Sequence, residues 1–339
     1  MGRIEQRKKR KKRRLKRYMY ILFALFLVVG GVASYFVFQT LQAASSSYDD
    51  LGREQSDLRD EAVNISDEPF SVLIMGVEDY ETEGASGRTD TLMLVTFDPD
   101  DQSAKMLSIP RDTRVDFAGM ERTDKINHAY AFGGKEMAID TVEKFLEIPV
   151  DYYVSVDFDA FIRIVDVLDG VTVNVPFDFE QKTMAPDSYY VQFYEGEQHV
   201  NGEEALAFVR MRKEDPRGDL GRVERQQEFL NALADEAMSL QSLTRVDRIA
   251  EVVGEEITTN VRIRDGFGML MNLNNFDRDN LESVDFDTYH QMIGGVSYQT
   301  PDRDSLAEAR MKLKEHLQLI EATPEEDEES EGEGGDEQH

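Results

Sequence analysis

Arginines are concentrated in one stretch of an otherwise acidic chain. Residues 208–227 contain five arginines and one lysine against four acids, whereas the whole 339-residue chain has a formal net charge of −30. Guanidinium groups bind phosphate and carboxylate oxygens in planar, bidentate pairs, and they keep their charge at any cellular pH. We therefore expect this arginine stretch to hold an anionic ligand, most simply a phosphorylated one.

Two predicted helices flank the arginine stretch. Residues 201–208 read as a short helix with a capping residue at its start, and residues 221–240 read as a longer one. On the second helix Arg222, Arg225 and Gln226 stand at positions i, i+3 and i+4, so we expect them to share one face. Proline and glycine between the helices predict a loop there.

Two more groups of charged residues follow predicted strands. One contains Glu78 and the Arg88-Thr89-Asp90 triplet, and the other is the Pro110-Arg111-Asp112-Thr113 turn. Carboxylates hold Mg²⁺ that bridges phosphate oxygens, and arginines neutralise charge on a leaving pyrophosphate. Surface ion pairs explain any one of these residues equally well, but they explain the three groups together less well.

Strand and helix patterns alternate along the central part of the chain. Apolar runs bounded by turn residues predict strands at 70–77, 91–98, 104–110, 152–156, 171–175 and near 281–286, with 91–110 forming a hairpin. Helical spacing predicts helices at 135–146 and 158–168, while 176–200 is expected to be a long aromatic-rich loop and 243–320 to add further helices. This alternation predicts an α/β domain whose mixed sheet is covered on both faces.

The N-terminal region predicts a membrane anchor. Residues 1–17 hold eleven Lys/Arg and one acid, and residues 18–38 carry no charge over 21 positions. Such a span crosses a bilayer as a helix, with the basic end in the cytoplasm and the remainder outside. A cleaved signal peptide is the alternative. We expect 39–68 to be an extracytoplasmic stem, 69–322 the main domain, and 323–339 a disordered acidic tail.

Composition excludes several classes of function. The chain has no cysteine, so disulfides, thiolate nucleophiles and cysteine-based zinc sites are excluded. Its five histidines show no HExxH or similar metal-binding spacing. With the basic N-terminus set aside, the remaining chain is so acidic that nucleic acid is not an expected partner of the main domain.

Several multi-residue motifs, taken together, resemble the LytR-CpsA-Psr family. The resemblance covers roughly residues 70–240, keeps the order and approximate spacing of the family, and includes the basic N-terminus and single span. The motifs are Gly-Arg-Thr-Asp-Thr at 87–91, Leu-Ser-Ile-Pro-Arg-Asp-Thr at 107–113, Lys-Ile-Asn-His-Ala-Tyr-Ala-Phe-Gly-Gly at 125–134, residues 167–176, Ala-Leu-Ala-Phe-Val-Arg-Met-Arg at 205–212 and Gly-Arg-Val-Glu-Arg-Gln-Gln at 221–227.

The resemblance implies a transferase of cell-wall assembly. Such proteins move a glycopolymer from undecaprenyl pyrophosphate to a muramic acid 6-hydroxyl of peptidoglycan, forming a phosphodiester. The implied fold is an α/β/α sandwich with an apolar channel for the polyprenyl chain. A polyprenyl-pyrophosphate phosphatase and a non-catalytic wall-polymer binding or regulatory protein are the alternatives. Whether the polymer is teichoic acid or capsule stays open, as does the oligomeric state.

The resemblance also assigns roles to individual residues. Arg88, Asp90 and Arg111 match catalytic positions, and Asp90 matches a ligand of Mg²⁺ (or Mn²⁺). Glu78 matches the second metal carboxylate, where the family more commonly has aspartate. Asp112 and Asp219 are expected only to support the site, and no general base is evident. The residues that match the pyrophosphate-binding set are Arg88, Arg111, Arg210, Arg212, Arg222, Arg225 and Gln226.

Overall fold

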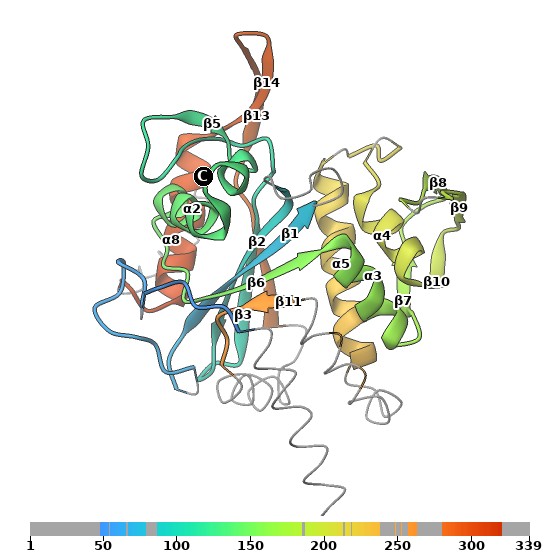
Figure 1. Cartoon of the computed structure of the whole chain (residues 1–339), viewed down its shortest axis with the longest axis horizontal. Coiled ribbons are helices and arrows are strands. Elements are labelled where there is room, and N and C mark those ends of the chain that lie inside the picture. Colours follow the sequence, from blue (N-terminus) through green and yellow to red (C-terminus); the bar gives the residue numbers. More distant parts are fainter. Residues whose placement is uncertain are drawn as a thin grey trace, which may run out of the picture.

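A computed structural model describes most of the chain beyond the predicted membrane span (Figure 1). The described residues are 48–53, 55–65, 67–78, 87–184, 187–212, 214–217, 219–237, 248, 252, 257–262 and 280–320. Within them, every helix is too short or too polar to cross a bilayer. The predicted span at 18–38 and the predicted acidic tail at 323–339 lie outside the described residues.

The centre of the molecule is a six-stranded mixed sheet. Its strand order is β11-β6-β1-β2-β3-β12, in which β1 pairs in parallel with β6 and β3 with β12, while the other pairs are antiparallel. The hairpin predicted at 91–110 is present as β2 and β3. The strands are β1 (Phe70–Glu78), β2 (Arg88–Asp98), β3 (Ser103–Ser108), β6 (Tyr152–Asp157), β11 (Ile257–Thr259) and β12 (Leu281–Val284).

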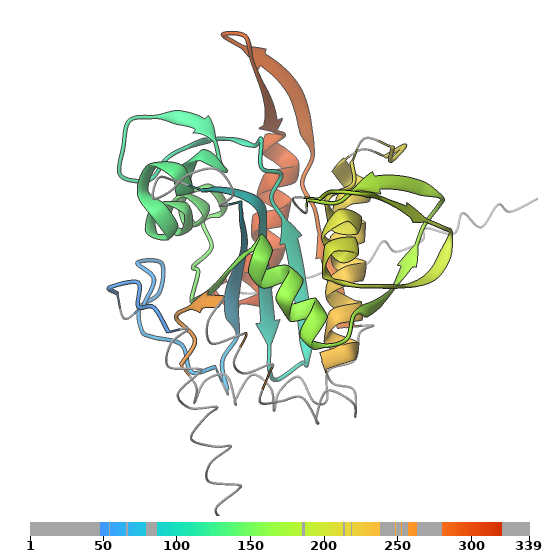
Figure 2. The ribbon, with the colours of Figure 1, turned by 45° about the vertical axis from the view of Figure 1, so that its right-hand side comes forward.

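Helices lie on both sides of this sheet, which confirms the predicted mixed α/β class. Figures 1 and 2 show α2 (His128–Leu146) and α8 (Arg303–His316) on one side. On the other side lie α3 (Phe158–Val167), α4 (Gly202–Arg210) and α5 (Asp219–Ala237). Asn201 caps α4 and Glu204 completes the capping box, as the sequence predicted.

Each side of the sheet has its own hydrophobic core. The core toward α2 and α8 includes Leu94 and Val142, both fully buried. The core around α3, α4 and α5 includes Val173 and Phe208, also fully buried. The second core extends away from the central sheet, because β7 (Val171–Val175) pairs with β10 (Gly196–Val200) in a separate two-stranded sheet.

The prediction of a long loop at 176–200 is wrong. This region contains β8 (Phe179–Lys182), β9 (Tyr190–Phe193) and β10. Val191 and Phe193 face the core while their neighbours are exposed. The strands are short and their outward positions carry polar and aromatic side chains, so the alternation of buried and exposed residues extends over too few positions to stand out in the sequence.

The C-terminal region also differs from the prediction, since it is richer in strands. A hairpin of β13 (Thr288–Ile293) and β14 (Val296–Pro301) precedes α8.

The region around α2 also contains elements that were not predicted. A small strand pair, β4 (Arg114–Asp116) and β5 (Thr123–Lys125), lies before α2. Helix α2 begins earlier than expected and is interrupted at Gly133 and Gly134, whose backbone angles are not helical.

Part of the segment predicted to be a stem contacts the domain. Arg59 forms an ion pair with the buried Asp151 at 2.8 Å, and Arg53 forms one with Glu143 at the same distance. Ile65 is 3% exposed and joins a small apolar cluster at the start of β1. Residues 48–68, where described, therefore lie against the sheet and α2.

Candidate active site

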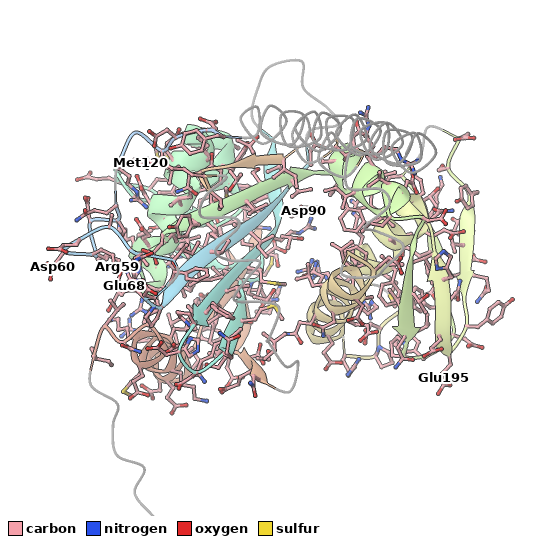
Figure 3. All side chains as sticks on the ribbon, turned by 90° about the horizontal axis from the view of Figure 1, so that it is seen from below. Arg59, Asp60, Glu68, Asp90, Met120 and Glu195 are labelled. Atoms are coloured by element: carbon pink, nitrogen blue, oxygen red, sulfur yellow. The ribbon has the colours of Figure 1, made fainter. Side chains whose placement is uncertain are left out.

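A cavity of about 280 Å³ lies between the sheet and the helices α3, α4 and α5. Most of its lining is apolar and comes from β1, β2, α3 and α5, including Ile74, Met93, Phe161, Ile164, Phe229 and Leu233. Figure 3 labels Asp90 between the sheet and this helical half of the molecule. The cavity therefore combines a hydrophobic interior with a charged group at the sheet.

Eight polar residues line the same cavity. Two of them are Thr91 and Asp157, and we call the other six the polar cluster. They come from the start of β2, the turn after β3, the end of α4 and the first turns of α5. The polar cluster consists of Asp90, Arg111, Arg210, Arg212, Arg222 and Gln226. All six were predicted site residues, so the fold brings together three regions that are distant in the sequence.

Asp90 is the anion in the polar cluster. The Nη1 of Arg111 donates a 2.7 Å hydrogen bond to Oδ1 of Asp90, and Nη2 of Arg210 lies 4.0 Å from Oδ2. The guanidinium of Arg210 also stacks over the ring of Phe158, 4.5 Å from its centroid. These contacts aim two arginines at one carboxylate beside an apolar cavity.

The turn that carries Arg111 is held by the segment that begins at Lys125. Nζ of Lys125 donates to Oδ1 of Asp112 at 2.7 Å. The backbone N–H groups of Ile126 and Asn127 donate to the carbonyls of Thr113 and Arg111, at 2.8 and 3.2 Å. The first residues of the motif at 125–134 therefore hold the Arg111 turn in place.

Asp112 lies beside Arg111 and is held ionised by its neighbours. Burial alone would raise the pKa of Asp112, but the hydrogen bond from Lys125 and the charges of Arg111 and Arg212 outweigh it, so the pKa is lowered. The carboxylate therefore stays ionised and fixes the Arg111 turn.

Arg225 was predicted to bind pyrophosphate, and the structure places it elsewhere. Its side chain is 2% exposed, does not line the cavity, and forms a buried ion pair with Asp215. Its guanidinium also donates to the backbone carbonyls of Phe208, at 3.3 Å, and Met211. Arg225 thus joins α5 to the end of α4, while Arg222 and Gln226 on the same helix line the cavity.

Asp215 and Gly221 are structural residues that sequence reasoning missed. A Cβ at Gly221 would lie 1.8 Å from Oδ2 of Asp215, so only glycine lets the Asp215 carboxylate lie against α5. Burial opposes ionisation of Asp215, but the Arg217 backbone N–H and Arg225 lower its pKa. In the sequence, Asp215-Pro216 predicts only a loop, and no local pattern indicates a buried ion pair.

Arg88 and Glu78 lie near the site, at the paired ends of β2 and β1. The Arg88 side chain is exposed and does not line the cavity, although it stands two positions before Asp90 and so on the same face of the strand. The side chains of Glu78 and Asp219 lie outside the described part of the structure.

The described residues contain no cluster of three or more His, Asp or Glu side chains able to hold a metal ion. Asp90 is nevertheless suited to a Mg²⁺ ion that takes most of its ligands from phosphate and water. Its carboxylate lines the cavity with a side chain 14% exposed, and Arg111 and Arg210 are its described ion-pair partners. The donor set fits a substrate-bridging ion and not a closed protein cage.

Comparison with known proteins gives consistent matches over most of the chain. The LytR_cpsA_psr family model matches residues 34–315. The polyisoprenyl-teichoic acid–peptidoglycan teichoic acid transferase TagV of Bacillus subtilis (strain 168) is 45% identical over 301 residues, which are 87% of this chain and 77% of TagV.

Solved structures agree with the sequence matches. The crystal structure of B. subtilis TagV is similar with a TM-score of 0.66 and 44% identity, covering 74% of this chain and 98% of TagV. A structure of TagT bound to LIIa-WTA is similar with a TM-score of 0.65 and 32% identity, covering 80% of this chain and 99% of TagT. The chain belongs to the LytR_cpsA_psr family.

Proposed function

We propose that this protein transfers teichoic acid from a polyisoprenyl pyrophosphate carrier to peptidoglycan. The observation that carries the proposal is the cavity, in which apolar side chains adjoin the polar cluster around Asp90. A polyprenyl chain needs the apolar lining, and its pyrophosphate needs Arg111 and Arg210. TagV and other relatives are named for this transfer, which supports the assignment.

The transfer exchanges one phosphorus–oxygen bond for another. The acceptor hydroxyl, at the muramic acid 6-position, attacks the phosphorus nearer the sugar, and the bond from that phosphorus to the bridging oxygen breaks. Undecaprenyl phosphate leaves with the bond electrons, and the hydroxyl proton passes to a base that the described residues do not identify. The product is a phosphodiester between glycopolymer and peptidoglycan.

The polar cluster supplies electrostatic stabilisation for this exchange. Negative charge builds on the bridging and terminal phosphate oxygens, where fixed arginines cost no reorganisation at the moment of reaction. Arg111 is oriented by Asp90 and by the Asp112–Lys125 pair. Arg212, Arg222 and Gln226 line the same cavity and would bind the remaining oxygens.

Asp90 would hold Mg²⁺ (or Mn²⁺), which supplies further charge neutralisation at the phosphate oxygens. Glu78, at the paired end of β1, is the second carboxylate that we propose for this ion. Arg88, on the same face of β2 as Asp90, is the arginine that we propose for the outer part of the pyrophosphate.

Membrane attachment is part of the proposal. The predicted span at 18–38 would hold the domain on the outer side of the membrane, where a lipid-linked donor also lies. Tethering raises the encounter frequency of two molecules confined to the same surface.

A reconstituted transfer reaction tests the function. The full chain in detergent is mixed with a synthetic lipid-linked teichoic acid donor and peptidoglycan fragments. Expected products are polymer-linked peptidoglycan and prenyl monophosphate, with both reduced strongly by Asp90→Asn. Release of prenyl monophosphate at the same rate with and without acceptor would instead identify a phosphatase. Full complementation of a deletion strain by Asp90→Asn and Arg111→Ala would identify a non-catalytic protein.

A further inference from the structure

The β13–β14 hairpin is a largely exposed element of the described structure that the proposed mechanism does not use. Figures 1 and 2 show it extending from the body of the domain beyond the sheet and helices. Its turn is Gly294-Gly295, with φ of 58° and 83°. Positive φ at both positions is what a tight two-residue hairpin turn requires.

The hairpin is electrically neutral in a highly charged chain. Residues 288–301 contain no Asp, Glu, Lys or Arg, although such residues make up 31% of the chain. A projecting ribbon in a soluble domain would ordinarily carry charges on its exposed positions. Without lysine or arginine, and with the single histidine His290, it is poorly suited to a polyanion or to anionic lipid headgroups.

One face of the hairpin combines apolar and hydrogen-bonding side chains. Tyr289 and Ile293 alternate along β13 with Gln291, and Val296 pairs opposite Ile293. Tyr289, Ile293 and Val296 are 53%, 37% and 43% exposed. Thr300 donates a 2.9 Å hydrogen bond to Oε1 of Gln291, which holds the amide on this face.

The base of the hairpin is attached to the turn that carries Arg111. The backbone N–H of Gln299 donates to the carbonyl of Asp112 at 2.9 Å, and Gln299 forms an isolated parallel bridge with Thr113. The hydroxyl of Tyr298 donates to Oδ1 of Asp124 at 3.4 Å. A ligand lying along the hairpin would thus be connected, through one residue, to Arg111 of the polar cluster.

We propose that the β13–β14 hairpin binds the acceptor glycan and presents its hydroxyl to the polar cluster; this inference rests on the proposed transferase function. Uncharged sugar rings offer apolar faces to tyrosine and aliphatic side chains, and hydroxyl and amide groups to glutamine and threonine. Attachment to the Arg111 turn fixes the approach of the acceptor, which is the positional gain that a two-substrate reaction needs.

The test variant replaces the exposed apolar residues of that face: Tyr289→Ser, Ile293→Ser and Val296→Ser together. The matched control carries Tyr190→Ser and Tyr194→Ser, which are 64% and 63% exposed in and beside β9. Glu195, beside Tyr194, lies at the outer edge of the domain, far from Asp90 (Figure 3). All five positions are exposed apolar or aromatic ones, so loss of surface apolarity alone affects both variants.

Binding of the full-length chains is measured by cosedimentation with peptidoglycan sacculi stripped of teichoic acid. The KM for the acceptor is measured separately, in transfer assays. We expect the hairpin variant to bind sacculi about ten-fold more weakly and to raise the KM for acceptor by a similar factor. Affinity for the lipid-linked donor should be unchanged, and the control should match the wild type.

Three results would overturn the proposal. These are unchanged sacculus binding by the hairpin variant, an equal loss in the control, and a loss of binding to phosphatidylglycerol vesicles while sacculus binding persists, which would make the hairpin a membrane contact. Cosedimentation needs no catalysis, so failure of the hairpin proposal and failure of the transferase function give different results.

Discussion

Two Asp–Arg pairs of the molecule have opposite surroundings. The core pair, Asp215 with Arg225, has side chains 0% and 2% exposed, and the guanidinium is also bound by two backbone carbonyls. The cavity pair, Asp90 with Arg111, has side chains 14% and 35% exposed and lines an apolar cavity. Both involve arginines matched to one family pattern.

The difference separates a structural arginine from a ligand-binding one. A guanidinium surrounded by protein acceptors must abandon buried hydrogen bonds before it binds a phosphate, which costs several kcal/mol. A partly exposed guanidinium can exchange one carboxylate contact for phosphate oxygens at small cost. We therefore attribute stability to the core pair and donor recognition to the cavity pair.

The largest expected effect is on stability. Asp215→Ala leaves the buried Arg225 without its carboxylate and should lower the free energy of unfolding by about 3–5 kcal/mol. Urea denaturation of the purified chain measures this. Asp90→Ala is the matched variant at the cavity and should cost less than about 1 kcal/mol, since Arg111 is accessible to water. Equal losses in the two variants would remove the distinction between the pairs.

The next effect is on catalysis. Arg111→Ala should lower the transfer rate about 10²–10³-fold, the usual result of removing one preorganised group that stabilises charge in the transition state. The melting temperature should change little. Steady-state assays with lipid-linked donor measure the rate.

Arg217→Ala provides the control for Arg111→Ala. Arg217 lies in the arginine-rich stretch 208–227, outside the cavity lining, and its side chain is 46% exposed. It pairs with Glu224 on the surface and, at 3.7 Å, with Asp215. We expect wild-type activity from this variant. A loss comparable to that of Arg111→Ala would mean that the whole stretch acts through its net charge.

A double substitution sharpens the contrast. Asp215→Leu with Arg225→Met removes both buried charges together and should cost no more than about 2 kcal/mol, less than Asp215→Ala alone, because no unpaired charge remains. Transfer activity should survive. The corresponding cavity double variant, Asp90→Leu with Arg111→Met, should be stable and inactive. Urea denaturation and transfer activity are measured on the same preparations. A stable but inactive core double variant would contradict a purely structural role for the Asp215–Arg225 pair.

The smallest effect concerns pH. The pKa of Asp215 is lowered in the folded protein, so its stabilising contribution is present above the unfolded value of about 3.9 and is lost as the pH falls through the folded value. The stability difference between wild type and Asp215→Asn should therefore shrink on acidification below pH ~4. Urea denaturation at several pH values measures it, and a difference that grows on acidification has the wrong sign.

Most of the candidate site was predicted from the resemblance of its motifs to one family, which matched Asp90, Arg111, Arg222 and Gln226 to functional positions. Local signals placed Asp90 and Arg111 beside predicted strands and Arg222 and Gln226 on one helical face, but they did not show that these regions meet. The central α/β domain was predictable from local signals, since apolar runs and helical spacing alternate through it.

Tertiary contacts decide what the sequence left unresolved. Arg225 has the helical spacing that predicts a common face with Arg222 and Gln226. In the structure its side chain instead lies against the C-terminal end of α4 and pairs with Asp215. The β13–β14 hairpin was missed even though Gly294-Gly295 between alternating residues is a hairpin signal, because the flanking positions are mostly exposed. Lys125 acts through Asp112, and Gly221 makes room for Asp215. Neither partner is adjacent in the sequence, so no local pattern predicts these contacts.

A crystal structure of this chain with a bound polyprenyl pyrophosphate tests the central claim most directly. We expect an apolar chain in contact with Ile164, Phe229 and Leu233, with phosphate oxygens about 3 Å from the guanidinium groups of Arg111 and Arg210. Arg225 should keep its pair with Asp215. A lipid bound outside this cavity, or a pyrophosphate held by Arg225 with the Asp215 pair broken, would contradict the account.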